Sequence, residues 1–436
     1  MNLVAQYTPS ISGEVLCPGD KSISQRAVII GSLLNEDIEI SGFLNGEDPI
    51  STANALNAIG SSIKINGTSV SIKKRDIPFK DPSVNVDLGN SGTGMRLMMG
   101  LISSLGIKAT LVGDESLTKR PMLRVANPLN DMGATVTCNE GKPPVKILDG
   151  LIKDNFSYEM PIASAQVKSS IILAALAANK KVIVIEKHPT RNHTERMISY
   201  FNGDIHTESH DLGNKISLMP SKLIPAEKYE VAGDFSSASF LIVAGLIAKE
   251  SNLLIKNVGL NPTRCGLISV LRSMGAKIEI KNERLISNEE VGDIHVVSSE
   301  LHGIAISGDI IPNIIDEIPI LSIAASFANG ETLITEAGEL RVKESDRLQA
   351  ISDGLQKINI HHELFHDGIK IIGSSEDISV MAEIDSHGDH RIAMSFLIAS
   401  LRSKKGIYVE DCKNILTSFP NFIEVMSSLG VAINER

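Results

Sequence analysis

The stretch PGDKSISQR, residues 18–26, is followed directly by the apolar run AVII, residues 27–30. Pro-Gly is typical of a turn, and the aspartate and serines after it are good caps for the first turn of a helix. A helix that begins here directs unpaired backbone N–H groups outward, beside a lysine and an arginine. The stretch therefore fits either an ordinary capped surface helix or a site for a phosphate or carboxylate group.

A second stretch, GDFSS at residues 233–237, repeats this turn before another long apolar run. We place the two crossings between domains near these stretches. The chain is then expected to divide into one domain of residues 1–19 plus 236–436 and another of residues 20–235. No Pro- or Ser-rich linker separates the halves, so the crossings are predicted to form a short two-strand hinge.

Six short segments with alternating apolar residues read as strands and lie about 70 to 80 residues apart. They begin at Glu36, Gly106, Lys180, Glu250, Gly330 and Gly406. Each is followed by a loop and an apolar helical pattern, and a period of this length fits a βαβαββ unit rather than a solenoid repeat. The sequence thus predicts an α/β (α+β) fold of two similar globular domains, each of three repeat units.

Composition narrows the class of protein. The chain has 436 residues, 42% of them hydrophobic, which is enough for two large cores. Aromatic residues make up only 4%, Trp is absent and the net charge is −10, all of which argue against a nucleic-acid partner. No apolar run approaches the ~20 residues of a membrane span, the first residues do not resemble a secretion signal, and four scattered cysteines lack metal-binding spacing. We therefore expect a cytoplasmic protein without a metal.

Basic or donor-rich residues recur at several other predicted turns and helix starts. These are GNSGTGMR at 89–96, LTKRPM at 117–122, SAQVKS at 164–169, DEIP at 316–319, LRVKESDRL at 340–348 and GDHR at 388–391. Each alone fits a capped helix, a packing turn or a solvated charge. Together, in an acidic protein, they favour one interdomain cleft for a substrate with more than one anionic group. Within the fifth motif, Lys343 and Arg347 are spaced to share one helix face, where they repel unless an anion or carboxylate lies between them.

The seven motifs, in this order between residues 18 and 420, resemble those of the 5-enolpyruvylshikimate-3-phosphate synthase family, in the form called class II. The resemblance implies a two-domain enolpyruvyl transferase-like fold. It also implies transfer of the enolpyruvyl group of phosphoenolpyruvate to the 5-hydroxyl of shikimate 3-phosphate, in the shikimate pathway of aromatic amino acid biosynthesis. Neither a metal nor a cofactor takes part, and members are generally monomers.

The resemblance also implies roles for individual residues. Shikimate 3-phosphate is expected to contact Lys21, Ser22, Arg26, Ser164, Ala165, Gln166, Arg191, Asp316 and Lys343. Phosphoenolpyruvate is expected to contact Lys21, Gly92, Arg120, Arg347 and Arg391. Among the catalytic groups, Asp316 accepts the proton of the 5-hydroxyl, Glu344 moves a proton at the methylene carbon, and Lys21 stabilises the charge that develops.

Three positions depart from the family pattern. Gln25 stands where the family usually has His, and Thr417 stands where some relatives have a Lys that binds phosphoenolpyruvate. His193 lies near the place of a Tyr that contacts substrate in some relatives, so that role is not transferred to it.

Two other functions stay open. The sister enzyme that modifies UDP-N-acetylglucosamine shares the fold but lacks the DKSIS and RVKESDR motifs and uses a loop cysteine, for which Cys138 has no matching surroundings. A metabolite-binding protein without catalytic activity could use the same scaffold, although the presence of Lys21, Asp316 and Glu344 speaks against it.

Overall fold

The computed structural model describes residues 1–148 and 150–436, which form two compact units. Unit 1 comprises Met1–Pro18, Gly233–Arg284 and Glu290–Arg436, and unit 2 comprises Gly19–Ala232 and Leu285–Glu289. These bounds differ from the expected domains at Gly19, at residues 233–235 and at Leu285–Glu289. The last segment is the tip of a hairpin whose two strands otherwise belong to unit 1, so its contacts could not be read from the order of the chain.

Strands of the described residues form six four-stranded sheets, three in each unit. In every sheet an edge strand pairs parallel with its neighbour, which in turn pairs antiparallel with the third strand. Parallel neighbours require a crossover, and in four of the sheets the helices α3, α5, α10 and α12 supply it. In the other two sheets the parallel pairs, β3 with β14 and β2 with β15, join segments about 190 and 230 residues apart. The predicted mixed α/β class with repeated βαβαββ units is confirmed.

Unit 2 contains one complete unit in the order β6-α3-β7-α4-β8-β9, a second in the order β10-α5-β11-α6-β12-β13, and a third to which β14 contributes the edge strand. Its strands are β3 (Ile38–Ser41), β4 (Ile63–Asn66), β5 (Ser69–Ile72), β6 (Val86–Asp87), β7 (Ala109–Val112), β8 (Thr135–Asn139), β9 (Lys142–Leu148), β10 (Phe156–Met160), β11 (Val182–Glu186), β12 (Ile205–His210), β13 (Gly213–Leu218) and β14 (Lys228–Glu230). Its helices are α1 (Lys21–Gly31), α2 (Glu47–Ala58), α3 (Gly92–Ile102), α4 (Leu123–Asp131), α5 (Ala165–Ala178) and α6 (His193–Tyr200), with a 3₁₀ turn η1 (Leu117–Lys119).

Unit 1 repeats the pattern, but the N-terminal strands β1 and β2 complete two of its sheets. Its strands are β1 (Leu3–Ala5), β2 (Ser10–Leu16), β15 (Glu250–Gly259), β16 (Ile278–Ile286), β17 (Glu289–Val297), β18 (Ala305–Ile306), β19 (Gly330–Ile334), β20 (His361–Leu364), β21 (Ile369–Gly373), β22 (Ala382–Asp385), β23 (Ile407–Glu410) and β24 (Ile433–Glu435). Its helices are α7 (Phe235–Ile247), α8 (Gly266–Ser273), α9 (Ile311–Ile314), α10 (Ile318–Ser326), α11 (Arg347–Lys357), α12 (His390–Ala399) and α13 (Phe422–Ser428). Four 3₁₀ segments complete the unit: η2 (Gly308–Ile310), η3 (Gly338–Val342), η4 (Ser400–Arg402) and η5 (Cys412–Thr417).

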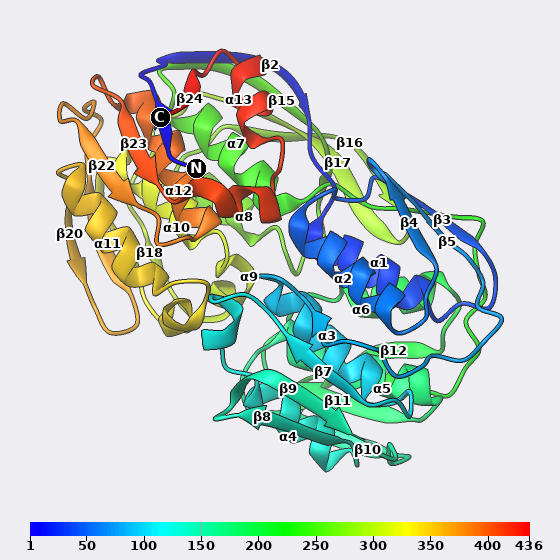
Figure 1. Ribbon diagram of the computed structural model, residues 1–436. Helices are drawn as coiled ribbons and strands as arrows, with labels where there is room; N and C mark the ends of the chain where they lie inside the picture. The colour runs from blue at the N-terminus through cyan, green and yellow to red at the C-terminus, as the bar shows by residue number, and fades with distance from the viewer. Residues whose placement is uncertain (149) are drawn as a thin grey trace. The chain divides into compact units, whose positions relative to one another are not determined.

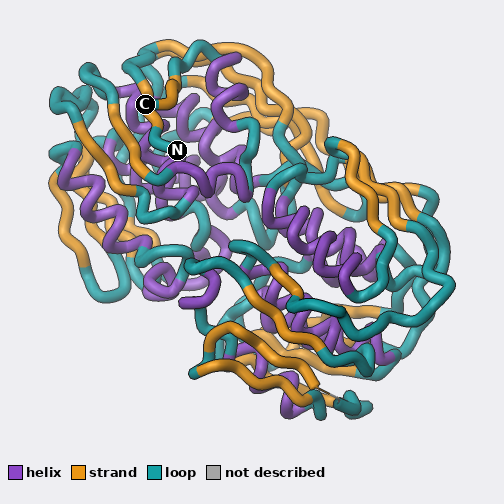
Figure 2. The backbone as a smooth tube through the Cα atoms, in the orientation of Figure 1, coloured by secondary structure: helices purple, strands orange, loops and turns teal. Residues whose placement is uncertain are grey.

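Three helices form the centre of unit 1 (Figure 1). Helices α7, α10 and α12 pack against one another, and every residue of the three is buried. Strands of the unit lie around them (Figure 2). A helix that is apolar on all sides is stable only in such a place. The serines in the middle of α10 and α12, Ser322 and Ser395, donate to the carbonyls of Ile318 and Arg391 in the preceding turn. The first turns of α7 and α12 are capped by Asp234 and Asp389, whose carboxylates accept backbone N–H groups of Ser236 and Arg391.

Unit 2 uses the same plan, because α3 and α5 pack together and α1 contacts α3. Their first turns are capped by Asp20, Ser91 and Ser164. The turn at residues 18–20 therefore opens a helix, as the sequence predicts, and its repeat at residues 233–234 opens α7. Within residues 1–148 and 150–436, no helix combines the length and apolar character that a membrane crossing requires.

Candidate active site

Arg26 is one of the buried cations of unit 2. Its side chain lies on α1, is 2% exposed, and donates to the Thr194 and Ser169 hydroxyls at 2.7 and 2.9 Å. Burial lowers the pKa of Arg26 to about 10, Glu195 opposes this effect, and the charge of Arg191 adds to it. Two like charges that act on each other inside a protein are stabilised when an anion binds to both. The charges of Arg26 and Arg191 therefore act on each other, which favours an anion near them.

Lys21 is the first residue of α1, where the helix dipole favours an anion. Its Nζ lies 3.0 Å from Oδ2 of Asp48, and the two side chains are 14% and 8% exposed. Ser22 follows in the same turn, and its carbonyl oxygen accepts a hydrogen bond from Nη1 of Arg26. The first turn of α1 thus presents backbone N–H groups, a hydroxyl and an ammonium group together.

Gly92 begins α3, and Arg120 lies against it. The guanidinium donates to Oδ1 of Asn90 at 2.7 Å and to the Ser116 hydroxyl at 3.1 Å. A Cβ atom on Gly92 would lie 3.0 Å from Nη1 of Arg120 and 3.3 Å from Nη1 of Arg96. The glycine therefore gives two arginines room at the positive end of a helix, which suits a small anion.

Gln166 is held at the start of α5 by two partners. Its Nε2 donates to the Thr93 hydroxyl at 2.8 Å, and its Oε1 accepts Nη1 of Arg96 at 2.7 Å. Ser164 caps this helix by accepting the backbone N–H of Val167, and Ala165 is its first residue. The amide of Gln166 therefore has a fixed orientation.

Gln25, which the sequence could not explain, has a structural role. It is fully buried, and its Nε2 donates to the hydroxyls of Ser91 and Thr52 at 2.6 and 3.0 Å and lies 3.4 Å from the Asp48 carbonyl oxygen. Ser91 is the cap of α3. A neutral amide on α1 thus fixes the first turn of α3 against α2.

Lys168 forms a buried ion cluster with Glu186 and Glu195. The side chain has no exposed surface, and its Nζ lies 3.0 Å from Oε2 of Glu186 and 2.8 Å from Oε1 of Glu195. It also donates to the carbonyl of Thr190 at 3.2 Å. The lysine thereby connects α5 to the residue that precedes Arg191.

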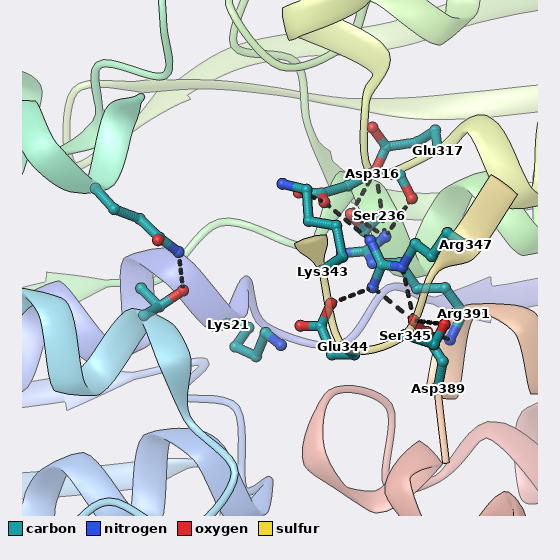
Figure 3. Close-up of polar contacts among 12 residues, drawn as sticks. Lys21, Ser236, Asp316, Glu317, Lys343, Glu344, Ser345, Arg347, Asp389 and Arg391 are labelled. Atoms are coloured by element: carbon teal, nitrogen blue, oxygen red, sulfur yellow. Dashed lines mark hydrogen bonds and ion pairs between the residues drawn. The ribbon is translucent and has the colours of Figure 1, made fainter. Parts of the chain in front are cut away.

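Arg347 organises the site of unit 1 (Figure 3). Its side chain is 1% exposed and is surrounded by three carboxylates. Its Nε lies 2.7 Å from Oδ2 of Asp389, its Nη2 2.6 Å from Oε2 of Glu344 and its Nη1 3.3 Å from Oδ1 of Asp316. Burial opposes the charge, but these carboxylates outweigh it and raise the pKa of Arg347 above its usual value. The guanidinium stays charged and fixes two carboxylates that could move protons.

Lys343 does not share a helix face with Arg347, so that expectation was wrong. Helix α11 begins only at Arg347, after its cap Asp346, and Lys343 lies in the bend between η3 and α11. The Asp346 side chain ends the segment by accepting the backbone N–H of Gln349. Nζ of Lys343 lies 3.8 Å from Oδ1 of Asp316, and burial is the main cause that lowers the pKa of Lys343.

Arg391 occupies the first turn of α12. Its Nη1 donates to the Ser236 hydroxyl at 2.9 Å and to the Asp316 carbonyl at 3.0 Å, and lies 3.5 Å from Oε1 of Glu317. These contacts bring the first turns of α7, α10 and α12 to one place. Three positive helix ends and Arg391 together favour an anionic ligand.

Two positions that depart from the family pattern have internal partners. The Thr417 hydroxyl is buried in η5 and donates to the Asn414 carbonyl at 2.7 Å. His193 is 2% exposed, and its Nδ1 lies 2.8 Å from Oε1 of Glu289. Both side chains serve packing within their own unit.

The sequence-predicted residues divide between the two units. Unit 2 contains Lys21, Ser22, Arg26, Gly92, Arg120, Ser164, Ala165, Gln166 and Arg191. Among these, Gly92 lies against Arg120 and Arg96, and Arg96 holds Gln166. The cluster in unit 1 contains Asp316, Lys343, Glu344, Arg347 and Arg391.

Other side chains, not among the predicted site residues, hold the predicted ones in place. These are Arg96, Lys168, Ser236, Arg264, Glu317 and Asp389. All of them except Arg264 belong to the polar motifs at turns and helix starts, whereas nothing in the sequence around Arg264 marks it. In the part of the chain that the structure describes, no group of three or more His, Cys, Asp or Glu side chains is arranged to hold a metal ion.

Comparison with known proteins gives one consistent family. The model of the family described as EPSP synthase (3-phosphoshikimate 1-carboxyvinyltransferase) matches residues 6–426. Proteins named 3-phosphoshikimate 1-carboxyvinyltransferase are similar in sequence. The one from Ruthia magnifica is 45% identical, with 99% of this chain and 98% of that protein covered, and the one from Petrotoga mobilis is 46% identical, with 98% and 99% covered.

Solved structures agree. EPSP synthase from Acinetobacter baumannii superimposes with a TM-score of 0.86 at 40% identity, and the whole of both chains is covered. The enolpyruvyl transferase NikO from Streptomyces tendae, at 14% identity and a TM-score of 0.76 over 99% of this chain and 98% of that one, shares the fold. The match of the family model over nearly the whole length, together with these identities, shows that the chain belongs to the EPSP synthase family.

Proposed function

We propose that the protein transfers the enolpyruvyl group of phosphoenolpyruvate to the 5-hydroxyl of shikimate 3-phosphate and releases phosphate. Family membership supports the reaction. In the addition step, a bond forms between the 5-oxygen and C2 of phosphoenolpyruvate, the hydroxyl proton leaves, and C3 gains a proton. In the elimination step, C3 loses a proton and the C2–phosphate bond breaks, so that the vinyl ether and phosphate are formed.

One observation carries the chemical assignment: the carboxylates of Asp316 and Glu344 are bound to the same guanidinium, that of Arg347, at 3.3 and 2.6 Å. The reaction needs one group for the hydroxyl proton and another at the vinyl carbon. Two carboxylates fixed on either side of one cation supply them. We assign Asp316 to the hydroxyl and Glu344 to the methylene carbon.

We assign the anionic groups of the two substrates mainly to positive side chains at or near the first turns of helices. We assign the 3-phosphate to the first turn of α1 with Ser22 and Arg26, and to Arg191. The partly buried charges of Lys21, Arg120 and Arg391 are assigned to phosphoenolpyruvate and, with Arg347, to the charge that develops in the intermediate. Gly92 leaves room for the second substrate, and the fixed amide of Gln166 and the polar groups of Ser164 and Lys343 orient the first.

We further propose, as the sequence indicates, that the protein works as a monomer, in the cytoplasm and without a metal or cofactor.

The direct test is to mix purified protein with shikimate 3-phosphate and phosphoenolpyruvate and to measure phosphate release. We expect release that requires both substrates. Release only with UDP-N-acetylglucosamine in place of shikimate 3-phosphate would establish the sister reaction. Binding of both substrates without release would establish the non-catalytic alternative.

A further inference from the structure

Arg264 is a buried arginine of unit 1 that neither the motifs nor the proposed contacts include. Its side chain is 4% exposed and lies in the segment that leads into α8. Its Nη1 lies 2.8 Å from Oε1 of Glu317, and its Nη2 donates to the Ser236 hydroxyl. The same Nη2 lies 3.7 Å from Oδ1 of Asp234, the cap of α7. The guanidinium therefore reaches the place where the central helices begin.

The backbone around Arg264 is fixed by its own turn. The backbone N–H of Arg264 donates to the Asn261 carbonyl at 2.8 Å, and the Asn261 side chain accepts from the backbone N–H and hydroxyl of Thr263 at 3.0 and 2.7 Å. Gly266 donates to Oδ1 of Asn313 at 3.0 Å. The arginine is thus held from a rigid turn, so its guanidinium has a defined position.

Glu317 connects Arg264 to the proposed substrate site. The carboxylate is fully buried, and its Oε1 accepts the Ser236 hydroxyl at 2.5 Å as well as Arg264. The same oxygen lies 3.5 Å from Nη1 of Arg391, which is farther than its 2.8 Å separation from Arg264. A buried carboxylate needs a close cation, and here Arg264 is the closer one.

The Ser236 hydroxyl joins Glu317, Arg264 and Arg391. It donates to Glu317 and accepts from both Arg264 and Arg391, which uses its one donor and two acceptor sites. Arg391 is then directed by Ser236 and by the Asp316 carbonyl rather than by a direct bond to Glu317.

We infer that Arg264 is a positioning residue that neutralises Glu317 and thereby leaves the charge of Arg391 for the phosphate or carboxylate of an anionic substrate. The inference rests on the proposed function, which assigns phosphoenolpyruvate to Arg391. Without Arg264, the Glu317 carboxylate has Arg391 as its nearest cation. Arg391 then moves toward Glu317, away from its Ser236 and Asp316 partners, and its affinity for the substrate falls.

The test is a cycle of Arg264→Met, Glu317→Gln and the double variant, with the KM of each substrate measured by phosphate release. For Arg264→Met we expect the KM for phosphoenolpyruvate to rise about tenfold or more, which corresponds to about 1.4 kcal/mol or more. The KM for shikimate 3-phosphate should stay within about twofold. In the double variant, the amide that replaces the Glu317 carboxylate keeps an acceptor oxygen but carries no charge. The KM for phosphoenolpyruvate should then return to within about threefold of the wild-type value.

Arg272→Met is the matched control, because this arginine lies on the neighbouring α8, is exposed, and donates to the Ile278 carbonyl away from the cluster. Thermal unfolding is followed for all variants. If Arg264→Met does not fold, the KM for phosphoenolpyruvate is compared in the double variant and in Arg264→Lys. If Arg264 has only a structural role, the double variant should show no recovery of this KM. A wild-type KM in Arg264→Met, or a double variant as impaired as the single one, would overturn the inference. A wild-type protein that releases no phosphate would instead overturn the proposed function.

Discussion

Arg347 and Asp389 form an ion pair closed to solvent: Nε lies 2.7 Å from Oδ2, and the side chains are 1% and 0% exposed. The other oxygen of Asp389 accepts the backbone N–H of Arg391 at 2.9 Å and so caps α12. One carboxylate therefore fixes both a buried cation on α11 and the turn that carries Arg391.

Asp389→Asn should separate the two roles of this carboxylate. The amide oxygen still caps α12, but Arg347 loses the one fully buried carboxylate among its three partners. Breaking a buried pair costs about 3–5 kcal/mol. We expect this loss in the free energy of unfolding by urea denaturation, together with a higher KM for phosphoenolpyruvate. The control is Asp346→Asn, because Asp346 also caps a helix and binds an arginine but is 40% exposed. Its cost should be about 0–1 kcal/mol, and equal losses in both variants would contradict the assignment.

Asp316→Ala should slow turnover by orders of magnitude while shikimate 3-phosphate still binds. If Asp316 accepts the proton of the 5-hydroxyl, loss of the carboxylate lowers kcat by about 10²–10⁴. The dissociation constant of shikimate 3-phosphate, measured by calorimetry without the second substrate, should change far less. An unchanged kcat would refute the role of Asp316.

Lys343 gives an expected pH dependence. Burial, which outweighs the attraction of Asp316, lowers the pKa of Lys343 from its usual value. The ammonium group is present below its pKa, so its charge is lost as the pH rises, and at a lower pH than for a solvent-exposed lysine. We expect kcat/KM for shikimate 3-phosphate to fall on the alkaline side in that range. In the variant Lys343→Arg, the new guanidinium keeps its charge there, so the alkaline fall should move to higher pH; a profile that does not move would contradict this origin.

Gly92→Ala should weaken phosphoenolpyruvate binding without loss of stability. The new Cβ would lie 3.0 Å from Nη1 of Arg120, the end of a flexible side chain that can move away. Alanine is favoured over glycine in a helix by about 0.5–1 kcal/mol, so the melting temperature should not fall. The KM for phosphoenolpyruvate should rise, and inhibition by a phosphonate analogue such as glyphosate should weaken. A lower melting temperature with an unchanged KM would contradict the placement of the site.

Lys168→Met should destabilise unit 2 strongly. The substitution keeps the size of the side chain but leaves the buried carboxylates of Glu186 and Glu195 without their shared cation, at a cost of about 3–5 kcal/mol. Lys215→Met is the control, because the Lys215 pair with Glu208 is 31% and 62% exposed and should contribute about 0–1 kcal/mol. Urea denaturation measures the free energy of unfolding of both variants. Similar losses would show that the buried cluster contributes no more to stability than a surface pair.

Much of the fold could be predicted because its signals are local. The turn at residues 18–20 and its repeat at 233–234 open α1 and α7, and the repeated strand pattern gives the βαβαββ units. The hairpin tip Leu285–Glu289 could not be placed, because its membership of unit 2 depends on contacts such as that of Glu289 with His193, far away in the sequence.

The site was predicted less completely for a related reason. Residue spacing placed Lys343 and Arg347 on one helix, but Asp346 caps α11 and delays its start to Arg347. The partners that orient the charged groups come from other repeat units: Arg264 reaches Glu317, and Gln25 reaches Ser91. Such pairings depend on tertiary packing, which spacing along one segment does not contain.

Strand β1 has a consequence for synthesis of the chain. Leu3–Ala5 pairs with β23 and β24, so its partners lie about 400 residues later. A ribosome adds about 5–20 residues per second, so this strand waits roughly 20 to 80 seconds for them. During that interval Gly19–Ala232, nearly all of unit 2, is already available to fold. Strand β1 is thus among the last segments to reach its place, although it is made long before its partners. Chaperones that bind emerging chains therefore have a long opportunity at this strand.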